Sequence, residues 1–419
     1  MKPFRFVHTA DLHLDSPFKG LSEVSPALQT VMQEATFRAV QGIVDLCLKQ
    51  EAHFLLIAGD VYDAADRSLR GLAKLRGEFE RLAEHSIQVY MCHGNHDPLS
   101  GWGAKFSWPE NVHVFGAGGV EGKSVLHKGW EMARVYGVSY DTDHVSTNWA
   151  KAFQKEQASP WAIGLLHTNV GNDPNHMNYA PCELLDLVSG TMDYWALGHV
   201  HTHKVLHQDH PVVIYPGNPQ GRHRQECGPR GCYVVNVGEE GHADYEFVPV
   251  DVVRWQEEVV SIEGVRDFED LWARLDDRAH DIRGGSAGRG TIVRWHLQGR
   301  GGLHRDLTKP GKIEDLLATM RDKWGTGSGW VWTESLVDDT ARELDLEALR
   351  QEENLLGDFL RLADDMPESV VQEIREVIAP LFDDPRVHRH VTSPSDEAIR
   401  QWVKVAEKSG VDRLLAGEE

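Results

Sequence analysis

The chain has 419 residues, a length that ordinarily corresponds to two or three domains. Hydrophobic residues make up 41% of the chain and charged residues 26%, which argues against a disordered or fibrous protein and indicates a globular one. The sequence contains no apolar run of about 18 residues, so we expect no membrane span.

Two further features concern the cellular compartment. The cysteines are scattered, odd in number and without a C-x-x-C pair, which favours reduced thiols over a disulfide framework. The residues that follow Met1 enter a strand-like segment directly and lack the apolar core of a signal peptide. We therefore expect a cytoplasmic protein.

The formal net charge of -22 is unfavourable for a protein that binds nucleic acid, because phosphate contacts draw on basic surface. The acidity is uneven, since residues 1–220 hold 17 Lys and Arg against 24 Asp and Glu. Residues 221–419 hold the remaining 26 Lys and Arg against 41 Asp and Glu. Most of the excess therefore lies outside the region that carries the motifs described below, and bound divalent cations would offset part of the rest.

Short apolar runs, each followed by a polar loop, dominate the first half of the chain. Runs bounded in this way are typical of buried strands. They are Phe4–Thr9, Phe54–Ala58, Ile87–Cys92, Ala162–Leu166 and Tyr194–Leu197, with Pro211–Tyr215 and Gly231–Val237 further along. Helical spacing of apolar residues over Val31–Lys49 and Ser68–His85 places helices between strands, so the sequence predicts an α/β core. In such a core, functional side chains collect at the carboxyl ends of the strands.

The pattern changes after about residue 250, where strand-like and helical segments predict a small α+β module. Its expected elements are Val259–Ile262, Phe268–Arg278 and Thr291–Leu297. From residue 346 the sequence is charged and helix-like, with breaks expected at Pro367, Pro380 and Pro385. We therefore predict three domains, over residues 1–255, 256–345 and 346–419.

Residues that commonly bind metals follow each of the five strands in the first half. The motifs are D-x-H, G-D-x-x-D, G-N-H-D, a single His and G-H-x-H, and each alone is weak in a chain with 23 histidines. Their joint occurrence after successive strands predicts a metal centre. The candidate ligands are Asp11, His13, Asp60, Asn95, His167, His199 and His201.

These residue types suit a pair of metal ions about 3.5–4 Å apart, which can hold the attacking and leaving oxygens of a phosphoryl displacement. Imidazole and oxygen ligands without thiolate favour Mn²⁺, with Fe or Zn²⁺ as alternatives, over Ca²⁺. A divalent ion also makes a bound water easier to deprotonate, so this chemistry needs no Ser or Cys nucleophile.

The order of these motifs resembles that of the calcineurin-like metallophosphoesterase superfamily over roughly residues 1–250. The longer segments Thr9–Pro17, Gly59–Asp63 and Tyr215–His223 resemble the SbcD-type DNA repair nucleases, and in particular their YhaO-like bacterial branch. The resemblance implies a sandwich of two sheets flanked by helices, a small α+β capping domain that docks DNA, and a helical C-terminal segment.

The resemblance also implies a role for each ligand. Asp11, His13 and His201 would bind the first metal, and we term these three residues the first site. Asn95, His167 and His199 would bind the second metal and form the second site, and Asp60 would bridge the two. His96 would act beside the scissile phosphate, and Asp97 would orient His96 from behind.

Two further expectations concern the way in which DNA is cut and the residues that contact its phosphates. Some nucleases of this family have a histidine linked to exonuclease action where this chain has Asp63, so the balance of exonuclease and endonuclease cutting is open. Arg67, Arg222, His223 and Arg224 are candidate phosphate contacts, with ordinary surface as their alternative interpretation.

The remaining segments indicate partners. The helical tail, with Leu355, Phe359, Leu360, Leu362, Val370, Ile374 and Ile378, resembles the segment by which such nucleases bind the coiled coil of an SbcC-like ATPase. The same spacing would suit a helix packed on its own core. The resemblance further implies a homodimer formed through the helices between the first and third motifs.

Three functions fit these observations. The first is a metal-dependent DNA nuclease, and the second is a phosphodiesterase or phosphatase acting on nucleotides or other phosphoesters, since one metal core serves many substrates. The third is a catalytically weak subunit that holds an ATPase on DNA. The complete ligand set argues against the third function, and the net charge favours the second.

Overall fold

The computed structural model describes residues 1–21, 24–63, 65, 68–101, 106–157, 159–171, 179–364, 368–383 and 394–416. The chain divides into two compact units. The first unit comprises Met1–Glu258, Arg278–Arg294 and Ala318–Ser335, and the second comprises Val259–Asp277, Trp295–Leu317 and Leu336–Glu419. None of the described helices is both long and apolar enough to cross a bilayer.

A six-stranded sheet in the first unit has the order β12-β11-β1-β2-β3-β4. Strands β1 to β4 run parallel, and β11 pairs antiparallel with both β1 and β12. The strands are β1 (Phe4–Thr9), β2 (Phe54–Ala58), β3 (Gln88–Cys92), β4 (Val112–Val114), β11 (Gly231–Val237) and β12 (Ala243–Pro249).

A second six-stranded sheet has the order β5-β6-β7-β8-β10-β9. Its central strands β6, β7, β8 and β10 are parallel, and the two edge strands pair antiparallel. The strands are β5 (Glu121–His127), β6 (Trp130–Gly137), β7 (Ala162–His167), β8 (Tyr194–Gly198), β9 (Lys204–His207) and β10 (Val212–Tyr215).

The two sheets pack face to face around an aromatic core. Phe6 of β1 stacks on Phe54 of β2 with ring centroids 4.9 Å apart, and the edge of Tyr194 from β8 meets Phe6 at 5.2 Å. Ile163 and Ile214 from the second sheet belong to the same buried cluster. Burial of these apolar faces is the main favourable contribution to the stability of the sandwich.

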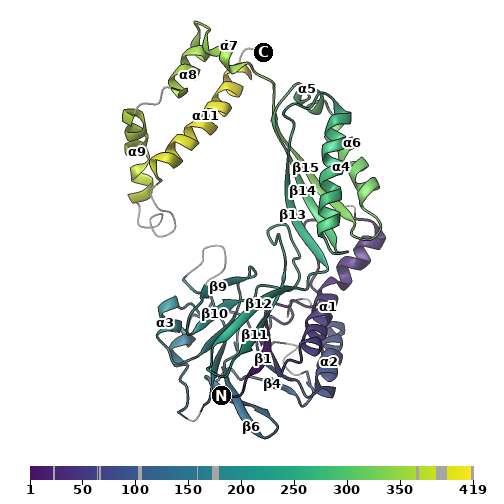
Figure 1. The fold of residues 1–419 in the computed structure, drawn as a ribbon, viewed down its shortest axis with the longest axis vertical. Coiled ribbons are helices and arrows are strands. Elements are labelled where there is room, and N and C mark those ends of the chain that lie inside the picture. Colours follow the sequence, from purple (N-terminus) through teal and green to yellow (C-terminus); the bar gives the residue numbers. More distant parts are fainter. Residues whose placement is uncertain are drawn as a thin grey trace. The chain divides into compact units, whose positions relative to one another are not determined.

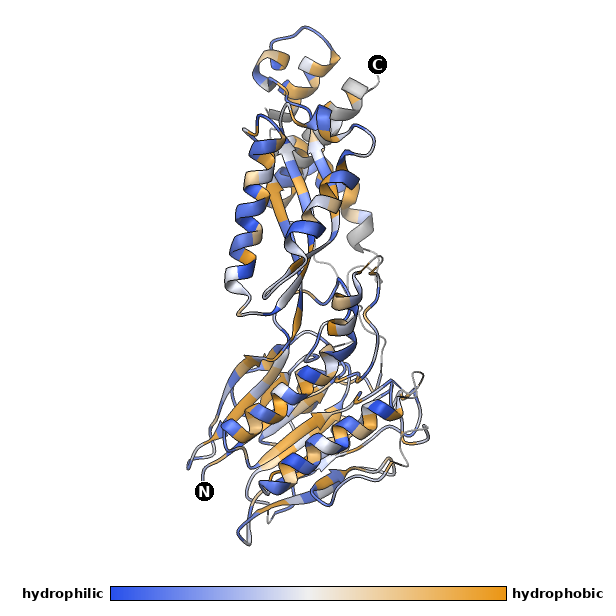
Figure 2. Cartoon of the chain, turned by 90° about the vertical axis from the view of Figure 1, so that its right-hand side faces the viewer, coloured by the Kyte–Doolittle hydropathy of each residue, from blue (hydrophilic) through white to orange (hydrophobic). Residues whose placement is uncertain are grey.

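Helices cover the outer faces of both sheets (Figure 1). Helices α1 (Pro26–Lys49) and α2 (Leu69–Glu84) pack Phe37, Val40, Leu75 and Phe79 on the first sheet. The second sheet is covered by the 3-10 helix η2 (Trp149–Ala152) and α3 (Leu184–Val188), through residues such as Leu187. Figure 2 shows hydrophobic residues concentrated on the strands and mixed character along the covering helices. The predicted α/β sandwich of two sheets flanked by helices is therefore confirmed.

A three-stranded sheet follows in the sequence, with the order β13-β14-β15. Its elements are β13 (Val253–Ser261), β14 (Gly290–Arg300), β15 (Val331–Ala341), α4 (Phe268–Gly285), α5 (His304–Leu307) and α6 (Lys312–Trp324). The C-terminal helices are α7 (Leu346–Arg350), α8 (Leu355–Asp364), α9 (Glu368–Asp383) and α11 (Asp396–Ala416). The expected helical C-terminal segment is thus present.

The break expected at Pro380 is wrong, because this proline lies inside α9. Proline removes one helical hydrogen bond and crowds the preceding turn, but Pro380 is exposed, so water can satisfy the carbonyl that is left. Pro367 and Pro385 lie outside the described residues. The sequence did not predict strands β5 and β6, since polar residues interrupt their apolar pattern and four of the seven residues of β5 are exposed.

The covering helix α2 provides a test of how the sandwich is stabilised. We expect Leu75→Ala to lower the free energy of unfolding by about 2–5 kcal/mol, because Leu75 is 1% exposed and its loss leaves a cavity. Leu69→Ala in the same helix is the control, since Leu69 is 60% exposed and should cost within about 0.5 kcal/mol. Urea denaturation followed by circular dichroism measures both. Equal losses would contradict the packing described here.

Candidate metal centre

The predicted ligands converge because parallel strands end at the same edge of each sheet. Asp11 follows β1, Asp60 follows β2 and Asn95 follows β3, while His167 ends β7 and His199 follows β8. Contacts between the sheets join the two edges, since the backbone N–H of His199 donates to the Asp11 carboxylate at 3.0 Å. The structure therefore brings the strand-end motifs into one cluster at the end of the sandwich.

The backbone at this cluster is strained. Asp11, His13, Asp60 and His199 all have positive φ angles, of 51°, 41°, 50° and 102°. Non-glycine residues in this region cost about 1–3 kcal/mol each and persist where surrounding structure fixes them, as functional sites often do. A Cβ on Gly94 would lie 2.3 Å from Asp60 Oδ1, so this position needs glycine to let the loop approach the carboxylate.

Asp60 occupies the centre of the cluster. Its Oδ2 lies 3.3 Å from His167 Nε2 and 3.9 Å from His13 Nε2, so one oxygen faces imidazoles of both predicted sites. Its Oδ1 accepts the backbone N–H of His96 at 2.9 Å. Asp60 is 1% exposed and Asp11 is fully buried, and among the described residues no Lys or Arg lies within salt-bridge distance of either. Two buried carboxylates without such a partner require another source of positive charge.

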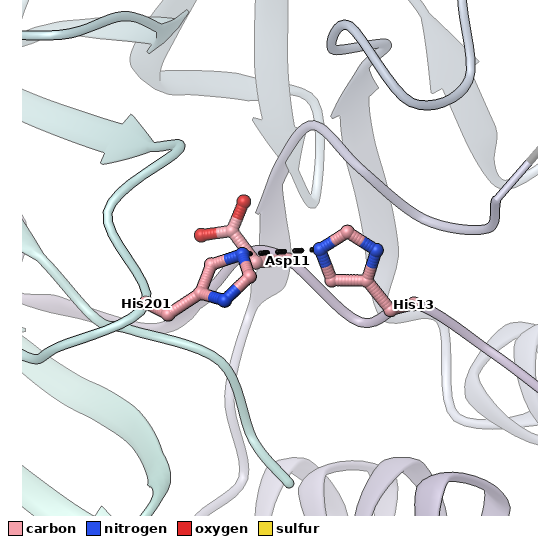
Figure 3. Close-up of side chains that lie close together, drawn as sticks. All are labelled: Asp11, His13 and His201. Carbon is pink, nitrogen blue, oxygen red and sulfur yellow. Dashed lines mark hydrogen bonds between the residues drawn. The ribbon is translucent and has the colours of Figure 1, made fainter. Parts of the chain in front are cut away.

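The first site provides nitrogen lone pairs for a cation (Figure 3). His13 Nδ1 lies 3.1 Å from Asp63 Oδ1, and His201 Nδ1 lies 2.6 Å from Glu226 Oε1. Ionised carboxylates only accept hydrogen bonds, so both Nδ1 atoms carry hydrogen. When the rings are neutral, the two Nε2 atoms, 3.2 Å apart, both carry lone pairs. A cation beside the Asp11 carboxylate is the group that this arrangement fits.

The second site has a similar arrangement around His167. Its Nδ1 lies 2.9 Å from the Ala58 carbonyl oxygen, which can only accept, so Nε2 carries the lone pair in the neutral ring. That Nε2 faces Asn95 Oδ1 at 3.0 Å. His199 is 7% exposed, and its ring lies 5.2 Å from that of His167, centroid to centroid. His167 Nε2, Asn95 Oδ1 and Asp60 Oδ2 thus lie together and fit a metal ion, and His199 lies beside them through the ring contact with His167.

The pKa values of the buried groups also indicate that the cluster favours a bound positive charge. Burial raises the pKa of Asp11 to about 6. Burial alone would lower the pKa of His167, but Asp60 and Asp11 more than offset this and raise it to about 9. Burial and the nearby Arg222 lower the pKa of His13 to about 4, so this ring is neutral and can donate its lone pair. The cluster therefore attracts a proton or a cation.

Asp63 connects the predicted catalytic histidine to the first site. Its Oδ1 lies 2.6 Å from His96 Nδ1 and also contacts His13, while Ser16 Oγ and Arg222 donate to Oδ2. Burial would raise the pKa of Asp63, but the hydrogen bonds from His13 and His96 hold it well below its ordinary range. Burial would likewise lower the pKa of His96, but the bond to Asp63 and the charge of Asp60 raise it. The contacts with Asp63 and Asp60 therefore favour the protonated form of His96.

The structure assigns the orienting role expected of Asp97 to Asp63 instead. The Asp97 carboxylate accepts the backbone N–H groups of Gly94 and Val61, at 2.7 and 3.0 Å, and lies 3.1 Å from His93 Nδ1. Asp97 therefore fixes the shape of the loop that carries Asn95 and His96. The expectation that it lies behind the His96 ring is wrong, because its side chain turns toward the loop backbone.

The four candidate phosphate contacts have different positions. Arg222 is 7% exposed and pairs with Asp63 at 3.3 Å, so it is not ordinary surface, and because it lines the cavity beside the site its contact with phosphate stays a prediction. His223 is partly buried and lies 3.4 Å from Glu226, whereas Arg224 is exposed. Arg67 lies outside the described residues.

Glu226 was not predicted from the sequence. It is 3% exposed and accepts the backbone N–H of Arg222 at 2.6 Å, in addition to its contacts with His201 and His223. Its position three residues after His223, the last residue of the Tyr215–His223 motif, was the available signal.

A cavity of about 690 Å³ opens onto the metal centre. Asp63, Asn95, His96 and Arg222 line it together with more peripheral residues, which include Lys19, Ser100, Thr142, Asp143 and Tyr179. The side chain of His96 is 49% exposed, so a phosphoester in this cavity could reach both His96 and the predicted ligands.

Comparison with known proteins identifies the class. A profile described as calcineurin-like phosphoesterase matches residues 4–203, and one described as the middle domain of metallophosphoesterase YhaO matches residues 255–341. The uncharacterized metallophosphoesterase YhaO of Bacillus subtilis is 35% identical over 396 residues, which cover 94% of each chain. The chain therefore belongs to the calcineurin-like metallophosphoesterases, and among them to the YhaO-like proteins. This family hydrolyses phosphoesters with divalent metals.

More distant relatives are DNA double-strand break repair proteins named Mre11. The protein from Methanopyrus kandleri is 25% identical over 301 residues, which cover 65% of this chain and 62% of that protein. The protein from Archaeoglobus fulgidus is 22% identical over 231 residues, which cover 51% of this chain and 49% of that protein. The chain thus spans about half to two thirds of these relatives.

The role of His96 can be separated from metal binding. We expect His96→Ala to lower the rate of bis-p-nitrophenyl phosphate hydrolysis by about 10²–10⁴-fold, since a proton donor at the leaving oxygen contributes on this scale. Metal content by mass spectrometry should stay near that of the parent. His85→Ala, a substitution of an exposed histidine after α2, is the control and should change neither quantity. Loss of metal together with activity in His96→Ala would refute the role.

Proposed function

We propose that this protein is a metal-dependent nuclease that hydrolyses phosphodiester bonds in DNA, by exonuclease or endonuclease cutting. We assign two divalent ions, with Mn²⁺ as the expected metal, to the first and second sites, and Asp60 would help to hold both. The ions would activate water and stabilise negative charge on the phosphate. His96, oriented by Asp63, would donate a proton to the leaving oxygen or stabilise charge there.

The observation that carries the DNA assignment is a second cavity, of about 390 Å³, next to the one at the metal centre. Lys19 lines both cavities, and the backbone N–H of Lys19 donates to the Arg222 carbonyl at 2.9 Å. The second cavity is lined further by Gly20, His223, Arg224, Gln225, Trp255 and Glu334. A substrate with one phosphate needs one such cavity, whereas a strand carries a phosphate on every nucleotide.

The charges in the second cavity favour an anion. Lys19 and Arg224 are exposed, and among the described residues no carboxylate lies within 4 Å of either side-chain charge. Glu334 is the acidic residue of this cavity, and Arg294 neutralises it through two hydrogen bonds of 3.0 Å. This local cationic surface is compatible with phosphate contacts despite the net charge of -22.

We also propose partners for the C-terminal helices and for α1 and α2. Leu360 is fully buried against Leu356 and Val411, so part of the predicted apolar stripe packs within the segment itself. The residues Leu355, Leu362, Val377 and Trp402 are exposed, at 72%, 74%, 78% and 49%. These exposed side chains would contact the coiled coil of an SbcC-like ATPase, and α1 with α2 would form a homodimer interface.

An activity assay with Mn²⁺ tests the proposed function. We expect cleavage of linear duplex or single-stranded DNA as well as bis-p-nitrophenyl phosphate, and loss of both activities in EDTA. Cleavage of the small diester without DNA cutting would support a phosphodiesterase with another substrate. DNA binding without cleavage of either compound would support a scaffold, and either outcome would overturn the nuclease proposal.

Substitution of the cationic side chains in the second cavity tests whether that cavity contacts DNA. Lys19→Ala and Arg224→Ala should each weaken DNA binding across all sequences and reduce the slope of log K against log salt by about 1. Lys128→Ala, which removes an exposed cation between β5 and β6, should leave the slope unchanged.

A further inference from the structure

A third cavity, of about 730 Å³, is larger than either of the two cavities described above. Ser16 and Pro17 line both this third cavity and the cavity at the metal centre, so the two cavities share this short segment as a wall. Ser16 Oγ also donates to Asp63, which holds His96. A space of this size suits a small organic group, and a group bound there would lie one segment away from the predicted proton donor.

The charged side chains of the third cavity neutralise each other. Among the described residues that line it, Asp15 and Arg70 are the charged ones, and Asp15 Oδ1 lies 3.5 Å from Arg70 Nη1. Glu34 also pairs with Arg70. The second cavity, in contrast, presents two exposed cations. The third cavity therefore favours an uncharged part of a ligand over a phosphate.

The floor of the third cavity is apolar. Phe18, Leu21, Val24 and Met32 line it, and Met32 is only 7% exposed. The Phe18 ring stacks on Trp255 with centroids 6.3 Å apart, and this contact holds the ring in place. Apolar and aromatic side chains of this kind suit the flat face of a heteroaromatic ring.

Two amides stand beside this floor. Gln29 and Gln33 both line the cavity, and because they are four residues apart in α1 they share one face of the helix. Both are exposed, and in the part of the chain that the structure describes neither side chain has a hydrogen-bond partner. Each amide offers two N–H donors and a carbonyl acceptor to a ligand.

We propose that the third cavity binds a nucleobase of the substrate. Every nucleobase combines a flat apolar face with an edge of hydrogen-bond donors and acceptors, and Gln side chains are common partners of that edge. The phosphate attached to this nucleoside would lie at the metal centre, on the other side of Ser16 and Pro17. The choice of a nucleobase rests on the proposed function, because it follows from a nucleic-acid substrate.

Hydrolysis of nucleoside esters tests the proposal. Thymidine 5′-(p-nitrophenyl phosphate) and its 3′ isomer carry a base, whereas bis-p-nitrophenyl phosphate carries none. For at least one isomer, the ratio of its kcat/KM to that of bis-p-nitrophenyl phosphate should fall about 10–100-fold in the double variant Gln29→Ala with Gln33→Ala. The reason is that each lost hydrogen bond weakens binding about 3–10-fold, and the change should appear mainly in KM.

Gln41→Ala is the matched control, since it removes an exposed glutamine of the same helix that does not line the third cavity. This variant should keep the ratio of the parent. An unchanged ratio in a folded double variant would overturn the proposal. If the oligomeric state by size-exclusion chromatography changes while the ratio does not, the cavity belongs to an interface between two copies, and the proposal is equally wrong.

If the double variant does not fold, by circular dichroism, crystals of the parent soaked with thymidine 5′-monophosphate provide the decision. Density for thymine beside Gln29 and Gln33 would support the proposal, and density elsewhere or none would contradict it. Failure of the proposed function gives a different result. In that case the parent would leave DNA uncut, while the double variant would still lower the ratio for the nucleoside ester.

Discussion

The carboxylates of Asp11 and Asp60 are buried at the ends of parallel strands, and no Lys or Arg among the described residues neutralises them. Burial of such charges is costly unless a cation or hydrogen bonds compensate. Much of the local structure around Asp11 and Asp60 is explained by the need to compensate these two buried charges. Strained backbone angles place the two aspartates, a glycine lets a loop approach Asp60, and the imidazoles of His13 and His167 turn ring nitrogens toward the carboxylates. The two-sheet core provides the rigidity that holds this arrangement.

Two carboxylates outside the predicted ligand sets hold predicted ligand side chains in place. Asp63 and Glu226 hold the Nδ1 atoms of two ligand imidazoles, and Asp63 also holds His96, the predicted proton donor. Arg222 links them, because its guanidinium pairs with Asp63 and its backbone N–H donates to Glu226. Two predicted metal ligands, His13 and His201, and the predicted proton donor His96 thus share one hydrogen-bonded network. A phosphoesterase needs both functions at one phosphate, and this network positions them together.

The sequence predicts the two-sheet fold, and it predicts that the strand-end motifs meet, because each motif follows directly after a strand. Local patterns of this kind survive folding, since strand ends in parallel sheets share an edge. The partner of His96 could not be predicted in the same way. Asp97 is its neighbour in sequence, but the loop backbone occupies that carboxylate, and Asp63 approaches from another strand end. Contacts between distant segments, such as Glu226 with His201, depend on packing that spacing does not encode.

Thermal unfolding of Asp60→Asn, compared with that of the parent, tests most directly whether the buried carboxylates bind cations. In EDTA, Asp60→Asn should be less stable than the parent at neutral pH, because the carboxylate raises the pKa of His167 to about 9 and the protonated ring, 3.3 Å away, would lose its partner. Mn²⁺ at 100 times its Kd should stabilise the parent by about 2.7 kcal/mol per site and the variant far less. A parent melting temperature that does not respond to Mn²⁺, or equal stabilisation of both proteins, would contradict this account.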